Sequence, residues 1–518
     1  MIDQIPNTEN DGHLNGFFFI APDYTFWSPA IMRSLAKSHE KAKFSAVVLG
    51  ELVHEVVTGM DDSLVSPVFR IDDLERAWLD APLDEGRIRH YEERLEPGAL
   101  RRILAGDRFV AAGLAPGGIL PETPLRRACN DFSAQQRYVV GVLDFLFDHL
   151  ESTRPDFAFF SSVADAFSTA AEVVCRELDI PFLSVYQTGV GTLCVIDELY
   201  QGRYTIVQED FERSLADGVR DEKQMQTALR YIQEFRDRPR PPDYKTYSDS
   251  ADGKLMPAID LAALAWRTMT GREPESLQHA YPGALLADQF MSKLRRWRAI
   301  RSPQFHRLDD FRGREFAFYP LHYDPEGSTM IWAPMHANQL PVLEALSKSL
   351  PLNMLLAVKE HPAMLGRRPA NFYEEITKLP GVVLVSAFED TFELIKASKL
   401  VCTITGTAGW EALLLRTPVL SVGPARACAV GEGAVHCPDL SSLPAGIKRA
   451  LSMNPASDER LALFLACMRR NGFDFSPAIY KERMSEESDF VKHLPVVDML
   501  AGQILRFLDK RAEFAQPH

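Results

Sequence analysis

One segment in the C-terminal half of this 518-residue chain carries residue types suited to binding an anion. It reads Thr405-Gly406-Thr407-Ala408-Gly409 and precedes apolar residues at helical spacing, so it is expected to open a helix. The first N–H groups of a helix have no partner within it and lie at the positive end of its dipole, which favours a bound phosphate. Thr405 and Thr407 could add hydroxyl donors, although Thr407 could equally be an ordinary helix cap. Glu411, in the first turn, could accept from two ribose hydroxyls or could simply suit that end of the helix.

A second segment, residues 359–362, reads Lys-Glu-His-Pro and follows an apolar run. His361 within it can donate to a phosphate oxygen and titrates near neutral pH, so contact with a phosphate would favour its charged form. A hydrogen-bonded structural histidine is the alternative. The following pair, Arg367 and Arg368, is expected to be the solvated start of a helix rather than a further anion contact.

The elements that must position these segments are four short apolar runs, at residues 355–358, 382–385, 400–404 and 419–422. Their spacing predicts parallel strands with helices in most of the gaps between them. Ligands of open α/β sheets bind at the carboxyl ends of the strands, which is where both segments fall. The sequence therefore predicts one half of a doubly wound domain that binds a phosphorylated ligand.

Several motifs in this region resemble a known family. VKEHP, GRRPxxFY, SxFEDTFELIK and TITGTAGWEALLLxxPVLSVG are similar to the C-terminal half of bacterial capsule polysaccharide biosynthesis proteins, which include the β-Kdo transferases. The resemblance is strong over about residues 316–423. It implies an α/β, GT-B-like fold, in which two Rossmann-like domains with parallel sheets face each other across a cleft, with helical insertions. The histidine-proline pair also occurs in GT-B sialyltransferases and in glycerophosphotransferases that use cytidine-linked donors.

The resemblance also implies roles for individual residues. His361 would contact the donor phosphate, residues 405–407 would line the phosphate loop, and Glu411 would lie near the nucleotide. A stretch similar to the family's PLHYxPE precedes them in the chain. The expected nucleotide-binding residues are therefore His322, Glu326, Lys359, Glu360, His361, Thr405, Gly406, Thr407, Ala408 and Glu411. Ser328 is a further candidate, and buried turn residues would look much the same.

The N-terminal part opens like a Rossmann domain, with predicted strands at residues 16–21, 44–49, 157–160 and 181–185, but without the G-x-G-x-x-G fingerprint of dinucleotide binding. Residues 61–136 are expected to be a helical and irregular insertion, and residues 186–192 a loop lining the cleft. Glycosyl transfer can need a general base, and GT-B enzymes often supply it from this domain. Asp23, Asp165 and Asp197 lie at predicted strand ends. Asp165, expected in the first turn of a helix capped by residues 161–162, ranks first, so Asp165 and His361 are the expected catalytic residues. The alternative for Asp165 is that it only complements the helix dipole.

Composition limits the partners of the chain. A net charge of −14 argues against nucleic acid as the main ligand. Seven cysteines without metal-ligand spacing, no secretion signal and no apolar run near the roughly 18 residues of a membrane span favour a reduced cytoplasmic protein. The basic stretch at residues 293–301 could contact lipid headgroups or an anionic glycan, or could be a solvated helix face with Trp297 turned inward.

These observations combine into one hypothesis with alternatives. Residues 1–235 form an N-terminal Rossmann-like, acceptor-side domain, 236–312 a linker and helices, 313–480 a nucleotide-sugar-binding Rossmann-like domain, and 481–518 helices that cross back. The expected activity is metal-independent and cofactor-free glycosyl transfer from a nucleotide sugar, with CMP-Kdo slightly favoured, to a glycan or glycolipid acceptor of capsule or another surface polysaccharide. Peripheral attachment at the inner membrane, or to a polysaccharide-assembly complex, stays open. A sugar-nucleotide 2-epimerase and a non-catalytic assembly protein are the alternatives.

Overall fold

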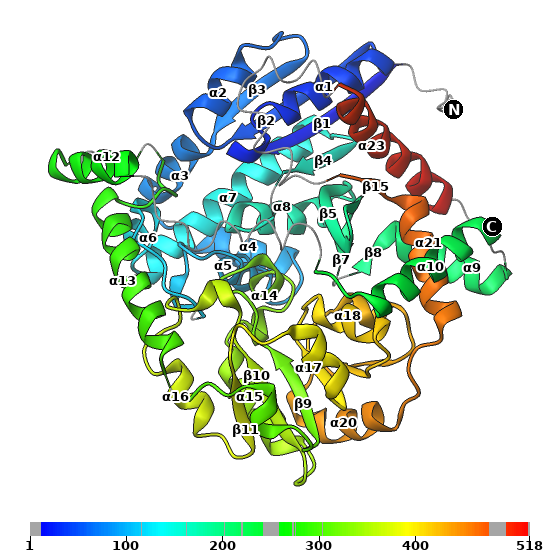
Figure 1. The fold of residues 1–518 in the computed structure, drawn as a ribbon. Coiled ribbons are helices and arrows are strands. Elements are labelled where there is room, and N and C mark those ends of the chain that lie inside the picture. Colours follow the sequence, from blue (N-terminus) through cyan, green and yellow to red (C-terminus); the bar gives the residue numbers. More distant parts are fainter. Residues whose placement is uncertain are drawn as a thin grey trace.

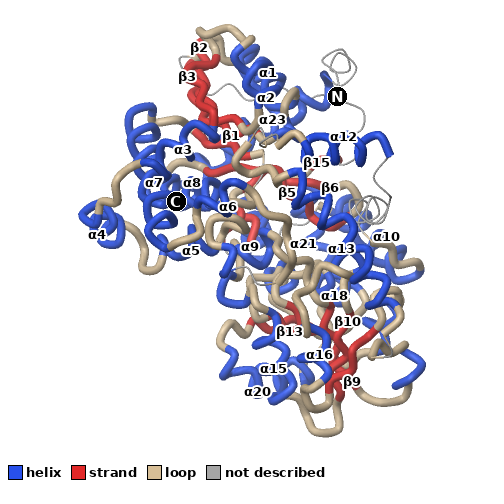
Figure 2. Tube along the Cα trace, turned by 90° about the vertical axis from the view of Figure 1, so that its left-hand side faces the viewer, coloured by secondary structure: helices blue, strands red, loops and turns tan. Residues whose placement is uncertain are grey.

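The computed structural model describes residues 12–114, 117–161, 163–200, 203–218, 221–241, 258–271, 274, 276–302, 304–475 and 494–515. Within these residues the chain forms a seven-stranded and a six-stranded sheet, each in its own lobe, and a two-stranded ribbon (Figures 1 and 2). This confirms the predicted α/β fold with two Rossmann-like domains. None of the helices in the described ranges combines the length and the apolarity needed to cross a bilayer.

The first sheet is built around strand β1. Its strands are β1 (His13–Ile20), β2 (Lys41–Val48), β3 (Val65–Arg70), β4 (Phe157–Phe160), β5 (Phe182–Val190), β6 (Leu193–Asp197) and β15 (Phe473–Asp474). The order is β15-β6-β5-β4-β1-β2-β3. Strands β1 to β5 are parallel, and β6 pairs antiparallel with both of its neighbours, β5 and β15. Phe17 and Phe19 pack on one face and Phe18 and Ile20 on the other, so both faces of this half of β1 are buried and residues 17–20 are continuously apolar.

Helices cover both faces of this sheet. One face carries α1 (Trp27–Ser38), α2 (Glu51–Thr58) and the C-terminal helix α23 (Leu494–Ala515). The other carries α3 (Ile71–Asp80), α4 (Glu85–Arg94), α5 (Ala99–Ala105), α6 (Pro124–Ala128), α7 (Phe132–Thr153) and α8 (Ala166–Glu177). The Oδ1 atom of Asp498 on α23 accepts from Ser34 Oγ (2.5 Å) and Lys37 Nζ (3.2 Å) on α1. The end of the chain therefore returns to the first lobe, and β15 joins the first sheet at residue 473, before the expected boundary at 480.

The second sheet is wholly parallel. Its strands are β9 (Phe316–Pro320), β10 (Leu355–Lys359), β11 (Val382–Val385), β12 (Leu400–Thr403), β13 (Val419–Ser421) and β14 (Ala434–His436). The order β11-β10-β9-β12-β13-β14 reverses direction between β9 and β12. The four predicted strands in this region are confirmed to within one residue at each end.

Helices pack on both faces of the second sheet as well. One face carries α15 (Gln339–Ser349), α16 (Phe372–Thr377) and α20 (Leu443–Ser452). The other carries α17 (Thr391–Ala397), α18 (Ala408–Leu414), α19 (Arg426–Ala429) and α21 (Asp458–Asn471), joined by α9 (Thr205–Asp217) and α10 (Glu222–Asp237). Arg236 of α10 donates to Leu414 O (2.7 Å) and pairs with Asp458 (2.6 Å), so this helix packs on the second lobe although it falls within the expected N-terminal domain.

Three local expectations differ from the structure. Residues 186–190 were expected to lie in a loop but extend β5 into a hairpin with β6, through a turn at Gly191 with φ +55°. The expected insertion at 61–136 begins with the edge strand β3, whose Pro67 is tolerated because an edge strand can lose a ladder hydrogen bond. Residues 425–436, where no helix or strand was predicted from the sequence, contain α19 and β14. The expected proline-rich linker extends beyond the described residues after 241.

Candidate functional site

The loops after β9 and β12 meet where the strand order of the second sheet reverses. His322 Nε2, from the loop after β9, accepts from the backbone N–H of Thr405 (3.2 Å). Thr405 Oγ1 in turn donates to the carbonyl oxygen of Ser328 (3.0 Å), the second residue of the short helix α14 (Gly327–Met330). Ligands of doubly wound sheets bind at this reversal point. The structure therefore brings His322, Thr405 and Ser328 together at the expected edge.

The predicted phosphate loop is partly occupied by the protein's own side chains. Besides the Thr405 N–H bound by His322, the Gly406 N–H donates to Thr403 Oγ1 (3.0 Å). These two amides therefore bind the protein's own side chains rather than a ligand. The role of residues 405–407 as the phosphate loop stays a prediction. Helix α18 does begin at Ala408, and the Thr407 side chain makes no cap hydrogen bond, so the ordinary cap proposed as the alternative for Thr407 is absent. At the start of α18 the amide suited to an anion is that of Ala408, the first residue of the helix.

Glu411 lies in the first turn of α18 with only 4% of its surface exposed. Within the described part of the chain, no hydrogen-bond partner lies within reach of its buried Oε1 atom. Leaving a buried acceptor unsatisfied costs about 1–3 kcal/mol, and more if it is charged. A ligand hydroxyl at Oε1 would remove this cost.

Arg426, at the start of α19, was not among the predicted site residues. Its Nη2 donates to Tyr204 Oη (2.6 Å) and to the carbonyl oxygen of Gln187 (3.2 Å), both from the first half of the chain. Its buried Nε and Nη1 find no partner among the described residues. A Cβ added at Gly409 would lie 3.4 Å from Ala427 Cβ, so α19 packs on the first turn of α18. A cation and a carboxylate, each with unused hydrogen-bonding capacity, therefore flank the start of α18. The signal in the sequence was an arginine a few residues after the end of β13.

His361 lies at the end of β10, on the other side of the β9 loop. Its Nδ1 accepts from the N–H of Ala363 (3.3 Å), so in the neutral ring the proton is on Nε2, which can donate. The ring packs edge-to-face on Tyr323, with centroids 5.9 Å apart. Lys359, the last residue of β10, is 6% exposed. The His361 segment and the start of α18 therefore flank the β9 loop on neighbouring strands.

A buried ion network underlies these loops. Arg368 is 3% exposed and pairs with Glu360 (2.9 Å) and Asp324 (2.7 Å), which are 0% and 4% exposed. Burial opposes the charge of Arg368, but the two carboxylates outweigh it and raise its pKa. Tyr373 Oη donates to Glu360 Oε2 (2.8 Å), and Glu360 Oε1 accepts from the N–H of His361 (2.6 Å). Two expectations were therefore wrong: Glu360 holds the loop instead of facing a ligand, and Arg368 is buried rather than solvated.

Arg368 and Gln339 connect this network to the β9 loop. Arg368 Nη2 donates to the carbonyl oxygen of His322 (2.7 Å), and Gln339 Oε1 accepts from the His322 N–H (3.0 Å). Gln339 Nε2 also donates to Asp324 Oδ2. The backbone of His322 is thus held on both sides, and with it the imidazole that binds Thr405. No pattern in the sequence distinguished Arg368 or Gln339 from surface residues.

The first lobe reaches the same edge. Arg368 Nη1 donates to the carbonyl oxygen of Gly117 (3.1 Å), and a Cβ added at Gly118 would overlap the backbone of Asp324. A Cβ added at Gly327 would lie 2.9 Å from the carbonyl oxygen of Val163, in the loop after β4. Loops at the carboxyl end of β4 therefore contact the candidate site. The expected cleft between the lobes stays a prediction.

Asp165 follows Val163 by two residues and caps α8. Its Oδ1 accepts from the Ser168 N–H (2.7 Å), and Ser168 Oγ accepts from the Asp165 N–H (3.2 Å), so Asp165 itself is the cap that was expected at residues 161–162. Burial raises the pKa of Asp165 to about 6. Its role as general base stays a prediction. Asp197 is 1% exposed and binds the start of α9 through Thr205 Oγ1 (2.6 Å), which gives it a structural role.

Two remaining predicted positions are both exposed. Glu326 is exposed and accepts from Ser328 Oγ (2.8 Å) at the start of α14. Asp23 lies in a 3-10 turn, Pro22–Tyr24, after β1.

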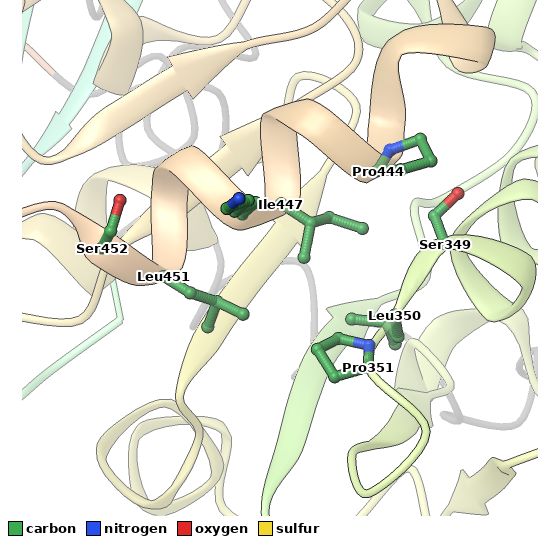
Figure 3. Close-up of a pocket in the computed structure, with 8 residues that line it drawn as sticks. Ser349, Leu350, Pro351, Pro444, Ile447, Leu451 and Ser452 are labelled. Carbon is green, nitrogen blue, oxygen red and sulfur yellow. The ribbon is translucent and has the colours of Figure 1, made fainter.

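A groove of about 410 Å³ lies elsewhere, between the end of α15 and helix α20. Figure 3 shows Pro444, Ile447 and Leu451 of α20 opposite Leu350 and Pro351. Because Pro351 precedes β10, this groove lies at the amino ends of the strands, at the opposite edge of the sheet from the loops described above. It is not part of the candidate site.

Comparison with known proteins finds a family similarity in one segment of the chain. Residues 294–431 match the family model described as capsule polysaccharide biosynthesis protein, which confirms the predicted family resemblance for that segment. No curated protein sequence matches the chain.

The chain is also similar to solved structures at low sequence identity. One is the KpsC beta Kdo 2,7 transferase of Thermosulfurimonas dismutans, with 12% identity, 62% of this chain and 78% of that chain covered, and a TM-score of 0.33. A MnaA–UDP co-structure from S. aureus has 11% identity, 93% and 97% coverage and a TM-score of 0.25. The glycotransferase of kitacinnamycin has 14% identity, 90% and 98% coverage and a TM-score of 0.23. These TM-scores are too low to carry an argument about function.

Proposed function

We propose that this chain is a GT-B glycosyltransferase that moves a sugar from a nucleotide-activated donor to an acceptor of capsule or other surface polysaccharide. The observation that carries the proposal is the pair Glu411 and Arg426 beside the start of α18, each with buried polar atoms that lack a partner among the described residues. The family match over residues 294–431 supports the biological class. The resemblance of the VKEHP motif to users of cytidine-linked donors favours a donor such as CMP-Kdo.

The donor would bind with its charged and hydroxyl groups on different side chains. Arg426 Nε and Nη1 and the amide of Ala408 would hold the phosphate, and Glu411 Oε1 would accept from a ribose hydroxyl. Nε2–H of His361 would add a donor to the phosphate from the other side of the β9 loop. These groups neutralise the leaving phosphate without a metal ion, so we propose that transfer needs neither a metal nor a cofactor.

The first lobe would supply the base for the acceptor. A carboxylate with a pKa near 6 is ionised at neutral pH and basic enough to take a proton in the transition state. Asp165 would accept the proton of the acceptor hydroxyl while the hydroxyl oxygen bonds to the anomeric carbon of the sugar. The bond from that carbon to the phosphate oxygen breaks in the same step, and the nucleotide leaves with the electron pair.

A thermal-shift panel with CMP, CDP, UDP and GDP tests the donor site. A nucleotide at about 100 times its Kd would stabilise the protein by about 2.7 kcal/mol. We expect CMP to raise the melting temperature of the wild type, and Glu411→Gln and Arg426→Gln to lose most of that rise, each measured against its own ligand-free melt. Arg416→Gln is the matched control, because Arg416 follows the opposite end of α18 and its side chain is 59% exposed.

Other outcomes discriminate between the alternatives. If none of the four nucleotides raises the melting temperature, the proposed donor site is wrong. If a nucleotide raises the melting temperature of the wild type and of all variants equally, the nucleotide binds at another site. A shift that disappears in a chelator would contradict metal independence. Conversion of a nucleotide sugar without any acceptor would replace the transferase by an epimerase.

A further inference from the structure

Helices α12 (Ala258–Met269) and α13 (Pro282–Ile300) form a hairpin at the side of the molecule that carries an unusual concentration of exposed apolar side chains. Figure 1 shows α12 at the outer edge and α13 running along the side of both lobes. Among the described residues, fourteen large apolar side chains are exposed, and seven of them lie on these two helices. They are Trp266 (51%), Met269 (79%), Phe290 (66%), Met291 (46%), Leu294 (41%), Trp297 (53%) and Ile300 (46%). The expectation that Trp297 would turn inward was therefore wrong.

The apolar residues of α13 form one continuous stripe. Phe290, Leu294 and Trp297 follow each other at intervals of four and three residues, which is the spacing of one helix face. Arg301 continues the same face four residues later, just after the helix ends. A surface helix normally buries such a stripe in its own protein.

In α13 it is the polar face that packs against the protein. Arg295 Nε donates to the carbonyl oxygen of Gly366 (2.7 Å), and Arg296 Nη1 donates to that of Pro362 (2.9 Å). The side chain of Asp288 is 7% exposed and pairs with Arg295 (3.7 Å). A Cβ added at Gly366 would overlap the backbone of α13, so the helix is seated directly on this loop. The orientation of α13 is thus fixed by bonded polar groups, with its apolar stripe outward.

The exposed side of the hairpin is also basic. Arg298 and Arg301 are exposed, Arg301 lies over the Trp297 ring (4.5 Å from its centroid), and Lys293 is half-buried. From residue 289 to 301 the chain contains no acidic residue, although its net charge is −14. An arginine-rich helix with tryptophan and phenylalanine on its outer face is the type that lies in a bilayer interface, where tryptophan prefers the headgroup level and arginine meets anionic lipid. In a symmetric contact between two copies of the chain, these cations would instead face the same cations of the other copy.

We propose that the α12–α13 hairpin docks the protein on a bilayer that contains anionic phospholipid. Trp297 and Phe290 insert among the headgroups, and Arg298 and Arg301 bind their phosphates. Because Arg296 holds Pro362, the residue after His361, docking brings that edge of the second lobe to the bilayer. The docking itself does not depend on the proposed function. If that function holds, docking of the hairpin places the proposed donor site beside a lipid-linked acceptor.

Vesicle flotation of the full chain tests this proposal. We expect binding to vesicles of phosphatidylcholine mixed with phosphatidylglycerol, weaker binding to phosphatidylcholine alone, and a loss of binding with rising salt. Arg298→Gln and Arg301→Gln should each weaken binding about five-fold. Trp297→Ser should weaken it on both kinds of vesicle. Since all three side chains are exposed, the variants should melt like the wild type.

Matched controls separate this surface from general stickiness. Leu352→Ser removes a fully exposed apolar side chain that precedes β10, and Arg312→Gln removes a cation whose side chain is 72% exposed and which precedes β9. Both lie at the amino ends of the strands, at the opposite edge of the sheet from the Pro362 loop on which α13 rests. Neither should change flotation. The proposal would be overturned if Trp297→Ser and Arg298→Gln bound vesicles as well as the wild type does. It would also be overturned if the wild type did not bind anionic vesicles. A concentration-dependent dimer that Trp297→Ser abolishes, without vesicle binding, would assign the face to a second copy instead. None of these readouts involves a nucleotide, so their failure leaves the donor site untouched.

Discussion

Removing the Arg368 side chain should destabilise the second lobe far more than any surface charge can. Arg368→Ala leaves Glu360 and Asp324, both buried, without their cation. Breaking a buried ion pair from one side costs about 3–5 kcal/mol. The bonds to the carbonyl oxygens of His322 and Gly117 are lost too, at about 1 kcal/mol each. The expected loss is therefore about 5–7 kcal/mol, comparable to the whole stability of many domains.

Thermal unfolding monitored by circular dichroism measures this loss of stability. With about 2–4 °C per kcal/mol for a lobe of this size, Arg368→Ala should melt at least ~10 °C below the wild type, or fail to fold. Arg367→Ala is the control from the next position, because the Arg367 side chain is 31% exposed and lies 3.6 Å from Asp288, which also has Arg295 as a partner. It should lose no more than about 1 kcal/mol.

The pH dependence gives a second, independent signature. The deficit of Arg368→Ala should shrink from neutral pH to about pH 5, since protonation removes the uncompensated buried charge. Arg368→Met should behave in the same way, which separates lost charge from lost volume. The reasoning would be refuted if Arg368→Ala melted within a few degrees of Arg367→Ala, or if its deficit did not depend on pH.

Two further predictions concern titratable groups in the first lobe. Glu75 is fully buried beside Tyr138, and burial raises its pKa to about 8, so wild-type stability should fall as pH rises from the ordinary value of 4.5 through 8. Glu75→Gln does not titrate, so its free energy of unfolding should gain on that of the wild type over this range, by up to roughly 5 kcal/mol, and the difference between the two melting temperatures should change with pH. A constant difference would contradict the raised pKa. Asp165→Asn should keep the cap of α8 and its stability but lower transfer at least about 100-fold, while Asp165→Ala should lose both. Full activity in Asp165→Asn would leave Asp165 only a capping role.

Local patterns in the sequence were sufficient for the framework of the site. Continuous apolar runs predicted β10 to β13, because strands buried on both faces need apolar residues at every position. Small and hydroxyl residues after residue 404 predicted the start of α18 at Ala408, since helix propensity and spacing depend on near neighbours along the chain. The position of His361 just after β10 followed from the same reasoning.

The roles of polar residues depended on partners far away in sequence, and only the tertiary structure decided them. Arg368 pairs with Asp324, 44 residues away, and with Gly117, 251 residues away, so nothing near it showed that it is buried. The amide of Thr405 is taken by His322, 83 residues away, and Arg426 meets Tyr204 from 222 residues away. Trp297 is exposed because Arg295 and Arg296 bond to carbonyl groups of a distant loop and thereby turn the polar face of α13 inward. An apolar pattern can be read along the chain because burial of apolar surface is nondirectional, whereas a buried polar group needs a specific partner that folding must supply.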